Sequence, residues 1–262
     1  EKGEADPGDV VLSVQGLRVV DERGVMMVND LDFDLRQGEI LGIAGVQGNG
    51  QRELVEAITG MRATDGGTVM IDHTDATGLT PRRITELGVG HIPEDRTKHG
   101  VVGAFTIADN LVLNRYHHSP FSRRWLRQEA AVAAEAEELV EEFDIRTPGI
   151  SVPVDNLSGG NKQKVIVARE LSHAVRILIA AQPTRGLDVG SIEFIHGQII
   201  SLRDRGTGVL LVSAELDEIL SLADRIAVLY RGRLVGMFDR ADTTREQLGY
   251  LMATGEAAAV AS

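Results

Sequence analysis

A short apolar segment, a glycine cluster and an amphipathic segment follow one another early in this chain, and together they constrain its fold most strongly. Residues 40–44 predict a buried strand, residues 45–50 a glycine loop and residues 53–58 a helix. The N–H groups of such a loop and the N-terminus of its helix can bind a phosphate group. The same pattern also fits a simple tight turn, so the function of the loop depends on the rest of the chain.

Apolar and helical segments alternate along the chain, which predicts an α/β fold with a mostly parallel sheet. Strands are expected at residues 10–20, 26–35, 66–71, 176–181 and 208–212. Helices are expected at residues 125–143, 157–171, 192–205 and 216–222, and a hairpin at 225–235. We assign residues 10–242 to one domain, with a flexible tail at residues 1–9 and a C-terminal tail at residues 243–262.

Composition excludes several classes of function. The net charge is −12, so the chain lacks the basic field by which proteins bind nucleic acid or an anionic membrane as their main partner. Cysteine is absent, which excludes disulfides and thiolate chemistry. No run of about 18 apolar residues and no signal peptide is visible. The polar start without methionine favours a fragment of a longer protein.

The glycine loop departs from the P-loop pattern Gly-x-x-x-x-Gly-Lys-Ser/Thr at two positions. Gln51 stands where lysine would neutralise phosphate charge, and Arg52 stands where a hydroxyl would bind Mg²⁺. Exchanging a charged hydrogen bond for a neutral one costs about 1–2 kcal/mol. The candidate nucleotide-binding residues are Gly45, Val46, Gln47, Gly48, Asn49, Gly50, Gln51, Arg52 and Glu53.

Two later motifs carry a family resemblance. Residues 157–163 read Leu-Ser-Gly-Gly-Asn-Lys-Gln, and residues 183–188 read Pro-Thr-Arg-Gly-Leu-Asp. A Ser hydroxyl and two Gly N–H groups at a helix N-terminus form an anion site, although Leu-Ser-Gly-Gly alone also fits an ordinary helix cap. In this order and spacing the motifs resemble the signature loop and the D-loop of the ATP-binding-cassette (ABC) family. The resemblance covers residues 10–239.

The resemblance implies an ABC-type P-loop NTPase core with a mostly parallel sheet, an antiparallel β subdomain and a helical subdomain at about residues 100–160. In this family two cassettes enclose two nucleotides, and the signature of one faces the γ-phosphate of ATP on the other. Asp188 is thereby implied at the interface between cassettes. The implied residues for binding phosphate in trans are Ser158, Gly159, Gly160, Asn161 and Gln163.

The family's catalytic positions are replaced in this sequence. The strand that should end in Asp-Glu ends in Ala181 and Gln182, and Ala214 takes the place of the switch histidine. Glu94 replaces the glutamine that contacts Mg²⁺, and residues 10–32 lack the adenine-stacking aromatic. Loss of a positioned base alone costs a factor of about 10²–10⁴ in rate. We therefore predict no intact catalytic residue or metal site, and inactive or very weak ATP hydrolysis by this domain alone.

The motifs, including residues 92–96 (Ile-Pro-Glu-Asp-Arg), resemble the C-terminal cassette of importers for simple sugars or nucleosides in which two cassettes are fused. Residues 180–183 (Ala-Ala-Gln-Pro) are most similar to the nucleoside, basic-membrane-lipoprotein type. The resemblance implies a transport-coupled ATPase that binds ATP and Mg²⁺ mainly at the site of an N-terminal cassette, in the same chain or a second subunit.

The same resemblance implies two further partners: transmembrane permease subunits and, indirectly, an extracytoplasmic solute-binding receptor. No nucleic acid partner is expected. The implied location is cytoplasmic, at the inner face of the plasma membrane through the permease.

Two other functions stay open: a regulatory or docking cassette that binds no nucleotide, and a non-transport ABC protein. The interval from Gln51 to Leu157 is too short for the coiled coil of the repair proteins, and the acidic charge is unsuited to RNA. Arg52 is a candidate substitute for the lost lysine charge, and Lys162 either contacts a phosphate or only lies on the first helical turn. His117 and His118 are expected in a surface loop.

Overall fold

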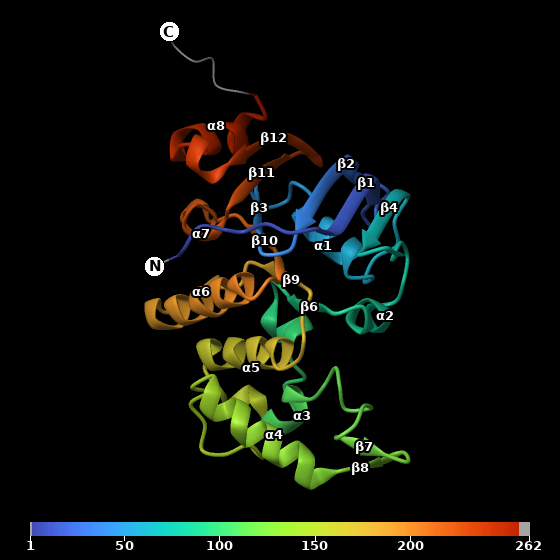
Figure 1. Ribbon diagram of the computed structural model, residues 1–262, viewed down its shortest axis with the longest axis vertical. Coiled ribbons are helices and arrows are strands. Elements are labelled where there is room, and N and C mark those ends of the chain that lie inside the picture. The colour runs from blue at the N-terminus through green and yellow to red at the C-terminus, as the bar shows by residue number, and fades with distance from the viewer. Residues whose placement is uncertain (1, 257–262) are drawn as a thin grey trace. The chain divides into compact units, whose positions relative to one another are not determined.

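The computed structural model describes residues 2–256 and divides them into two compact units (Figure 1). The sheet unit comprises the chain up to His91, Arg176–Gln182 and the chain from Gln198 onward. The helical unit comprises Ile92–Val175 and Pro183–Gly197. Each unit is described separately below. No helix within residues 2–256 is both long and apolar enough to cross a membrane.

A six-stranded sheet forms the centre of the sheet unit, in the order β12-β11-β3-β10-β9-β6. Strand β10 pairs in parallel with both β3 and β9, β11 pairs in parallel with β3, and β12 closes the edge antiparallel to β11. The predicted mostly parallel α/β sheet is therefore confirmed. The strands are β3 Ile40–Ala44, β6 Val89–Ile92, β9 Ile177–Ala181, β10 Gly208–Ser213, β11 Arg225–Tyr230 and β12 Arg233–Asp239.

A second, four-stranded sheet is antiparallel in every pair, in the order β2-β1-β4-β5. This confirms the antiparallel β region that the family resemblance implies. Its buried apolar side chains and those of the central sheet join one core, which also contains Leu54, Val55 and Ile58 of α1. The strands are β1 Val10–Val20, β2 Met26–Arg36, β4 Gly66–Ile71 and β5 Thr74–Asp75.

Helices α1, α2, α7 and α8 and a 3₁₀ turn also belong to the sheet unit. Helix α8 lies within the predicted C-terminal tail, and a capping box of Thr244 and Gln247 starts it. The burial of Leu248 and Leu251 explains why this part is helical. Residues 257–262 of the predicted tail lie outside the described residues. The elements are α1 Gln51–Ile58, α2 Pro81–Glu86, α7 Leu216–Leu222, η3 Arg240–Asp242 and α8 Arg245–Thr254.

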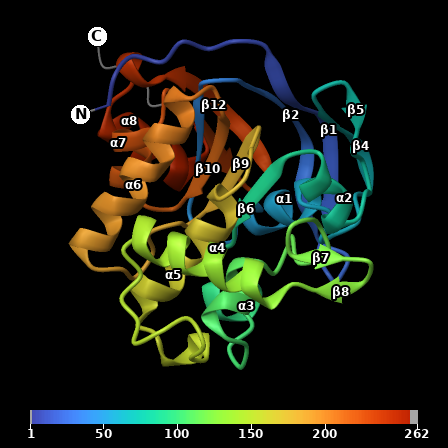
Figure 2. The same cartoon turned by 60° about the horizontal axis from the view of Figure 1, so that its bottom comes forward.

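The helical unit is built around α3, α4 and α5, which contact one another (Figure 2). Helix α6 runs from this unit into the sheet unit. The elements are the π-helical turn η1 Arg96–Gly100, α3 Ile107–Leu111, β7 Ser122–Arg123, β8 Leu126–Arg127, α4 Glu129–Glu142, the 3₁₀ turn η2 Val154–Asn156, α5 Gly159–Leu171 and α6 Val189–Asp204.

The helix predicted at residues 125–143 is wrong at its start. The structure forms the β7–β8 hairpin first, and α4 begins only at Glu129. Arg124 and Trp125 have φ values of 49° and 69°, which a right-handed helix cannot contain. The Ala- and Glu-rich pattern that favours the helix also starts at Glu129, so the prediction extended a correct helix over a turn.

Candidate functional site

The loop between β3 and α1 has the predicted strand–loop–helix form. Gly50 is the N-cap of α1 with φ 103°, and Gly48 has φ 89°, a region that side chains rarely enter. A Cβ atom on Gly50 would lie 2.1 Å from the carbonyl oxygen of Met27. The loop is therefore shaped by the approach of a neighbouring strand as well as by the turn itself.

The side chain of Gln51 lies across this loop and bonds to it. Its Nε2 donates to the carbonyl of Val46 at 2.8 Å, and its Oε1 accepts from the N–H of Asn49 at 3.1 Å. Only 7% of Gln51 is exposed. A loop N–H that could bind phosphate is thus already used by the protein's own side chain, in the absence of any ligand.

The turn between β11 and β12 holds the other side of the loop. Asn49 Oδ1 accepts from the N–H of Arg231 at 3.1 Å, and the carbonyl of Asn49 accepts from Gly232 at 2.9 Å. Gly232 in turn accepts from the N–H of Asn29 at 2.8 Å. Three segments of the sheet unit therefore fix the shape of the loop.

Arg52 does not turn back toward the loop. Its Nε donates to Glu56 Oε1 at 2.7 Å along α1, and Arg62 holds the other oxygen of the same carboxylate at 2.7 Å. Burial raises the pKa of Glu56, but its hydrogen bonds to Arg52 and Arg62 outweigh burial and keep the pKa below its usual value. The structure gives Arg52 a structural partner, so it offers no support for Arg52 as a substitute for the lost lysine.

The strands next to the loop end in residues without acid or base groups. In the parallel register Ala44 lies beside Ser213, and Val212 lies beside Ala181, so β3, β9 and β10 end at one edge of the sheet. Gln182 follows with φ 50° and donates its N–H to Val212 at 2.8 Å. Ala214 follows Ser213 at the same edge. The structure therefore places the loop, Ala181, Gln182 and Ala214 at the same edge of the sheet.

The helical unit carries the Leu-Ser-Gly-Gly motif at the start of α5. Ser158 is the N-cap, and its Oγ accepts from the N–H of Asn161 at 3.3 Å and from Asn161 Nδ2 at 3.1 Å. Asn161 also accepts from the N–H of Arg146 at 2.9 Å. Ser158 and Gly159 are exposed, so the start of this 13-residue helix is open to solvent. It retains the polar groups that suit an anion.

Gln163, which the resemblance implies in phosphate binding, and Lys162, whose role stays open in the sequence, both have structural partners. Gln163 is 2% exposed, and its Nε2 donates to the carbonyl of Pro183 at 2.8 Å. Lys162 Nζ pairs with Asp155 Oδ1 at 2.9 Å, which favours the structural alternative for Lys162. Gln163 therefore ties α5 to the Pro-Thr-Arg-Gly-Leu-Asp segment rather than pointing at a ligand.

Asp188 caps α6. Its two carboxylate oxygens accept from Ser191, from the N–H at 3.0 Å and from Oγ at 2.8 Å. These hydrogen bonds lower the pKa of Asp188. A Cβ on Gly160 would lie 2.6 Å from Ser191 Oγ, so only glycine allows α5 to begin this close to α6.

Sequence reasoning missed Arg96, which links these motifs. Arg96 Nη2 donates to the carbonyl of Arg185 at 2.7 Å, and Nη1 donates to the carbonyl of Gly159 at 3.4 Å. Arg185 also pairs with Glu94, with Nη1 2.7 Å from Oε1. We call Glu94, Arg96 and Arg185 the arginine link. Its only signal in the sequence is that Glu94 and Arg96 share one motif.

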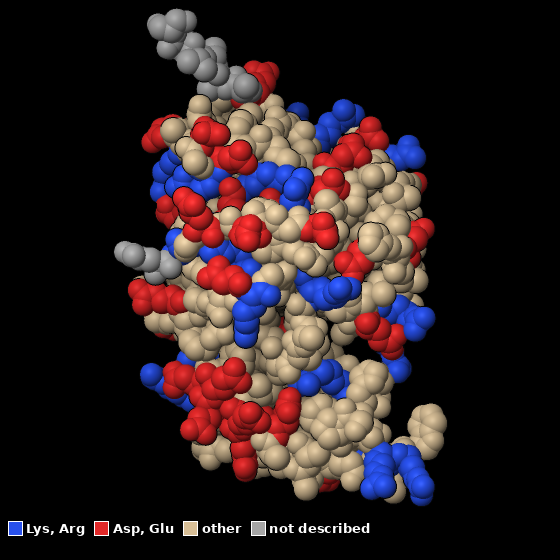
Figure 3. All heavy atoms as spheres, viewed as in Figure 1, with Lys and Arg blue, Asp and Glu red and all other residues tan. Residues whose placement is uncertain are grey.

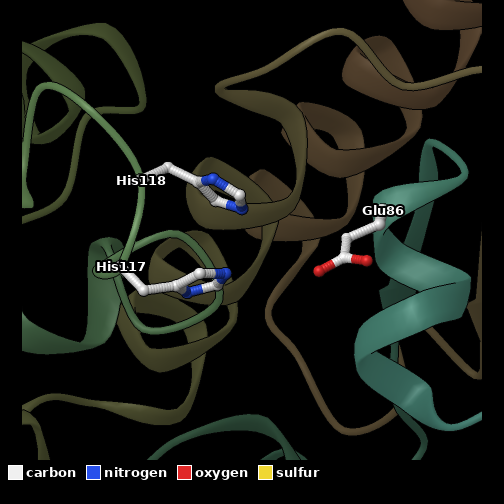
Figure 4. A group of neighbouring side chains, drawn as sticks. All are labelled: Glu86, His117 and His118. Carbon is white, nitrogen blue, oxygen red and sulfur yellow. The ribbon is translucent and has the colours of Figure 1, made fainter.

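His117 and His118 lie side by side, with ring centroids 4.0 Å apart (Figure 4). Both follow α3 in the helical unit, within the loop that the sequence predicts. Glu86, which the figure also draws, belongs to the sheet unit. We assign no metal site to these residues.

Comparison with known proteins decides the family. The family model described as ABC transporter matches residues 28–185. That is more than half of the chain. The chain belongs to the ABC transporter family.

Curated ABC relatives match along nearly the whole chain. The guanosine import ATP-binding protein NupO of Bacillus subtilis is 49% identical over 97% of this chain and 50% of the relative. The nucleoside import ATP-binding protein NupA of Lactococcus lactis is 47% identical over 97% and 50%. The glucose import ATP-binding protein TsgD13 of Haloferax volcanii is 41% identical over 95% and 46%. This chain thus spans about half the length of these relatives.

Solved ABC cassettes share the fold at low sequence identity. A nucleotide-free cassette is 19% identical, has a TM-score of 0.75, and covers 94% of this chain and 96% of its own. A dimeric cassette bound to ADP and Pi is 20% identical, has a TM-score of 0.74, and covers 87% and 98%. The ABC fold predicted from the motifs is therefore confirmed.

The family implies ATP, and typically Mg²⁺. The loop before α1 suits the phosphates of ATP better than it suits Mg²⁺. The loop backbone and the start of α1 suit a phosphate, although Gln51 occupies the N–H of Asn49. Mg²⁺ prefers oxygen ligands, and Arg52 and Ala181 offer no side-chain oxygen where the family has a hydroxyl and a carboxylate. These residues do not fit Mg²⁺.

Proposed function

We propose that this cassette is the non-hydrolytic partner in the ATPase of an importer, and that it completes an ATP site on another cassette. Its solvent-exposed Ser158 and Gly159, with Gly160, would bind the γ-phosphate held by that other cassette. The observation that carries the proposal is the contrast within one chain. The start of α5 keeps its capped, open anion site, whereas the loop before α1 is filled by Gln51.

The relatives support the class of solute. Two relatives at 49% and 47% identity are named for the import of guanosine and nucleosides, and others for glucose or for ribose and galactose. We propose nucleosides as the solute, with simple sugars as the alternative. The residues 180–183 favour the nucleoside type on the resemblance described above.

The proposal also names partners and a location. Because the relatives are about twice as long as this chain, an N-terminal cassette in the same chain is the partner that the proposal favours. It would supply the intact P-loop, the acidic pair and Mg²⁺. Permease subunits would hold both cassettes at the inner face of the plasma membrane, and a receptor would deliver the solute from outside.

The test uses the assembled importer. Ser158→Arg places a large cation at the start of α5, and ATP turnover should fall to background because the γ-phosphate loses its contacts across the interface. Ser201→Arg, an exposed serine on α6, is the matched control and should leave turnover unchanged. Normal turnover with Ser158→Arg would disprove the composite site.

A second candidate is a docking cassette that never holds nucleotide at its own loop. The hydrogen bonds of Gln51 favour it, because they already use a loop N–H that a phosphate would need. Titrating the chain with a fluorescent ATP analogue separates the two candidates. Weak saturable binding supports the composite-site cassette, and no binding supports the docking cassette. Strong Mg²⁺-dependent hydrolysis by this chain alone would overturn both.

A further inference from the structure

The β7–β8 hairpin carries a fully exposed indole at its tip. Arg123 pairs with Leu126, and the two residues between them, Arg124 and Trp125, form the turn. Both turn residues have positive φ, which is costly for large side chains. Trp125 is 100% exposed and Leu126 is 70% exposed. No other tryptophan occurs in the chain.

The same tip is basic although the chain is acidic. Arg123 and Arg124 are exposed, and neither has an ion pair with another residue in the range 2–256. Figure 3 shows basic side chains gathered at the hairpin end of the helical unit, whereas acidic ones gather over α4. Salt screens charges beyond about 8 Å at physiological ionic strength, so a contact at the tip responds to these arginines rather than to the net charge of −12.

The base of the hairpin is firmly held. Arg127 pairs with Asp109 and, at 3.2 Å, with Glu129. The N–H of Gln128 donates to the carbonyl of Phe121 at 2.8 Å, and Phe121 is buried beneath it. Because the base holds the hairpin in place, little backbone conformational entropy is lost when Trp125 makes a contact.

We propose that this tip inserts Trp125 and Leu126 into the headgroup region of an anionic bilayer, with Arg123 and Arg124 on lipid phosphates. Indole rings favour the membrane–water interface, and arginine beside them binds anionic headgroups. A convex two-residue turn covers too little area for a stable protein contact, which buries roughly 800 Å² on each side. A bilayer interface does not need such an area, because a small tip can bury its apolar side chains by inserting into the headgroup region.

The inference goes beyond the proposed importer function and does not depend on it. In the proposed importer even a weak contact of this kind would suffice, because partner subunits would hold the cassette near the membrane and tethering raises the effective concentration. Its test needs no nucleotide, no second cassette and no permease. Failure of the importer proposal and failure of the lipid contact are therefore distinguishable.

Fluorescence of the single tryptophan reports the contact directly. We expect the emission of Trp125 to shift to shorter wavelength on mixed phosphatidylcholine–phosphatidylglycerol vesicles and to stay unchanged on phosphatidylcholine alone. The shift should weaken as salt rises, since the attraction is electrostatic. Equal shifts on both kinds of vesicle, or no shift on either, would overturn the proposal.

Matched charge reversals locate the contact. Arg123→Glu with Arg124→Glu should weaken partitioning by more than about 25-fold, since each arginine alone contributes roughly fivefold. Arg82→Glu with Arg83→Glu, two exposed arginines on α2, changes the net charge equally and should leave partitioning nearly unchanged. Equal losses in both pairs would contradict a contact at the hairpin. A shift of Trp125 that appears only on assembly with permease would assign the tip to a protein surface instead.

Discussion

Gln51 makes two hydrogen bonds within its own loop, and these bonds hold the loop's shape together with those from the β11–β12 turn. Its partners are a carbonyl at one end of the loop and an N–H near the other. A lysine at this position would carry its charge to a phosphate, whereas the carboxamide satisfies the loop itself. The sequence shows which residue is lost, but only the structure shows what its replacement does.

Restoring the charge should restore part of the binding. Gln51→Lys should tighten the affinity for a fluorescent ATP analogue by about tenfold, because a charged contact replaces a neutral one. ATP hydrolysis should remain at background, since Ala181 and Gln182 are unchanged. Gln15→Lys, on an exposed position of β1, is the control for added charge. Equal affinity in Gln51→Lys and the unaltered chain would contradict this account.

Glu56 links pH to stability through α1. Its folded pKa lies below the unfolded value, so its contribution is present above about pH 5 and is lost as pH falls through the folded pKa. Glu56→Gln should therefore lower the free energy of unfolding at neutral pH, with a difference that shrinks in acid. Urea denaturation at several pH values measures this. Glu53→Gln on the same helix is the matched control and should change the free energy of unfolding less at neutral pH.

At the scale of elements, the arginine link joins η1, the start of α5 and the segment before α6. Its hydrogen bonds end on the carbonyls of Gly159 and Arg185, so Arg96 positions the backbone of both motifs. The link is partly exposed, and ion pairs open to solvent contribute little to stability. Its effect should therefore appear in function more than in folding.

Arg96→Ala should lower ATP turnover of the assembled importer by roughly 10–100-fold, because a small displacement of a binding group is costly. The unfolding midpoint of the chain should change little. Arg205→Ala, an exposed arginine elsewhere on the surface, serves as the control. A large fall in stability with unchanged turnover per folded molecule would show a structural role only.

Elements with strong local signals were predictable from the sequence. The strand at β3, the helix α7 and the parallel direction of the central strands follow from apolar segments and their spacing. The β7–β8 hairpin was not, because Arg124 and Trp125 carry no turn signal of the glycine or asparagine kind. The buried role of Gln163 was also hidden, because its partner lies on a different segment.

At the scale of the whole chain, a buried charge network ties together distant parts of the sheet unit. Arg203 is 1% exposed; its Nη1 pairs with Asp224 at 3.0 Å, and its Nη2 donates to the carbonyl of Gly3 at 3.1 Å. Asp224 also pairs with Lys2 at 2.5 Å and accepts from the N–H of Ile40 at 2.8 Å. One carboxylate thus holds the start of the described chain, β3 and α6.

Asp224→Ala should therefore destabilise the chain by about 3 kcal/mol, because it removes the more buried of the two carboxylates that pair with the guanidinium of Arg203. Asp242→Ala, an exposed carboxylate in η3, should change the free energy of unfolding by less than about 0.5 kcal/mol. Urea denaturation of both variants measures the difference. Equal values would show that the half-exposed Asp204 alone satisfies Arg203.

A loop that satisfies its own hydrogen bonds makes the stability of this cassette less dependent on bound ATP. Proteins that need a ligand to order a loop gain stability in proportion to that ligand's concentration, and lose it when the ligand is scarce. With Gln51 in place, the chain would keep the same lifetime whether ATP is abundant or depleted. In the proposed importer, this cassette would therefore persist when ATP is scarce and solute uptake is most needed.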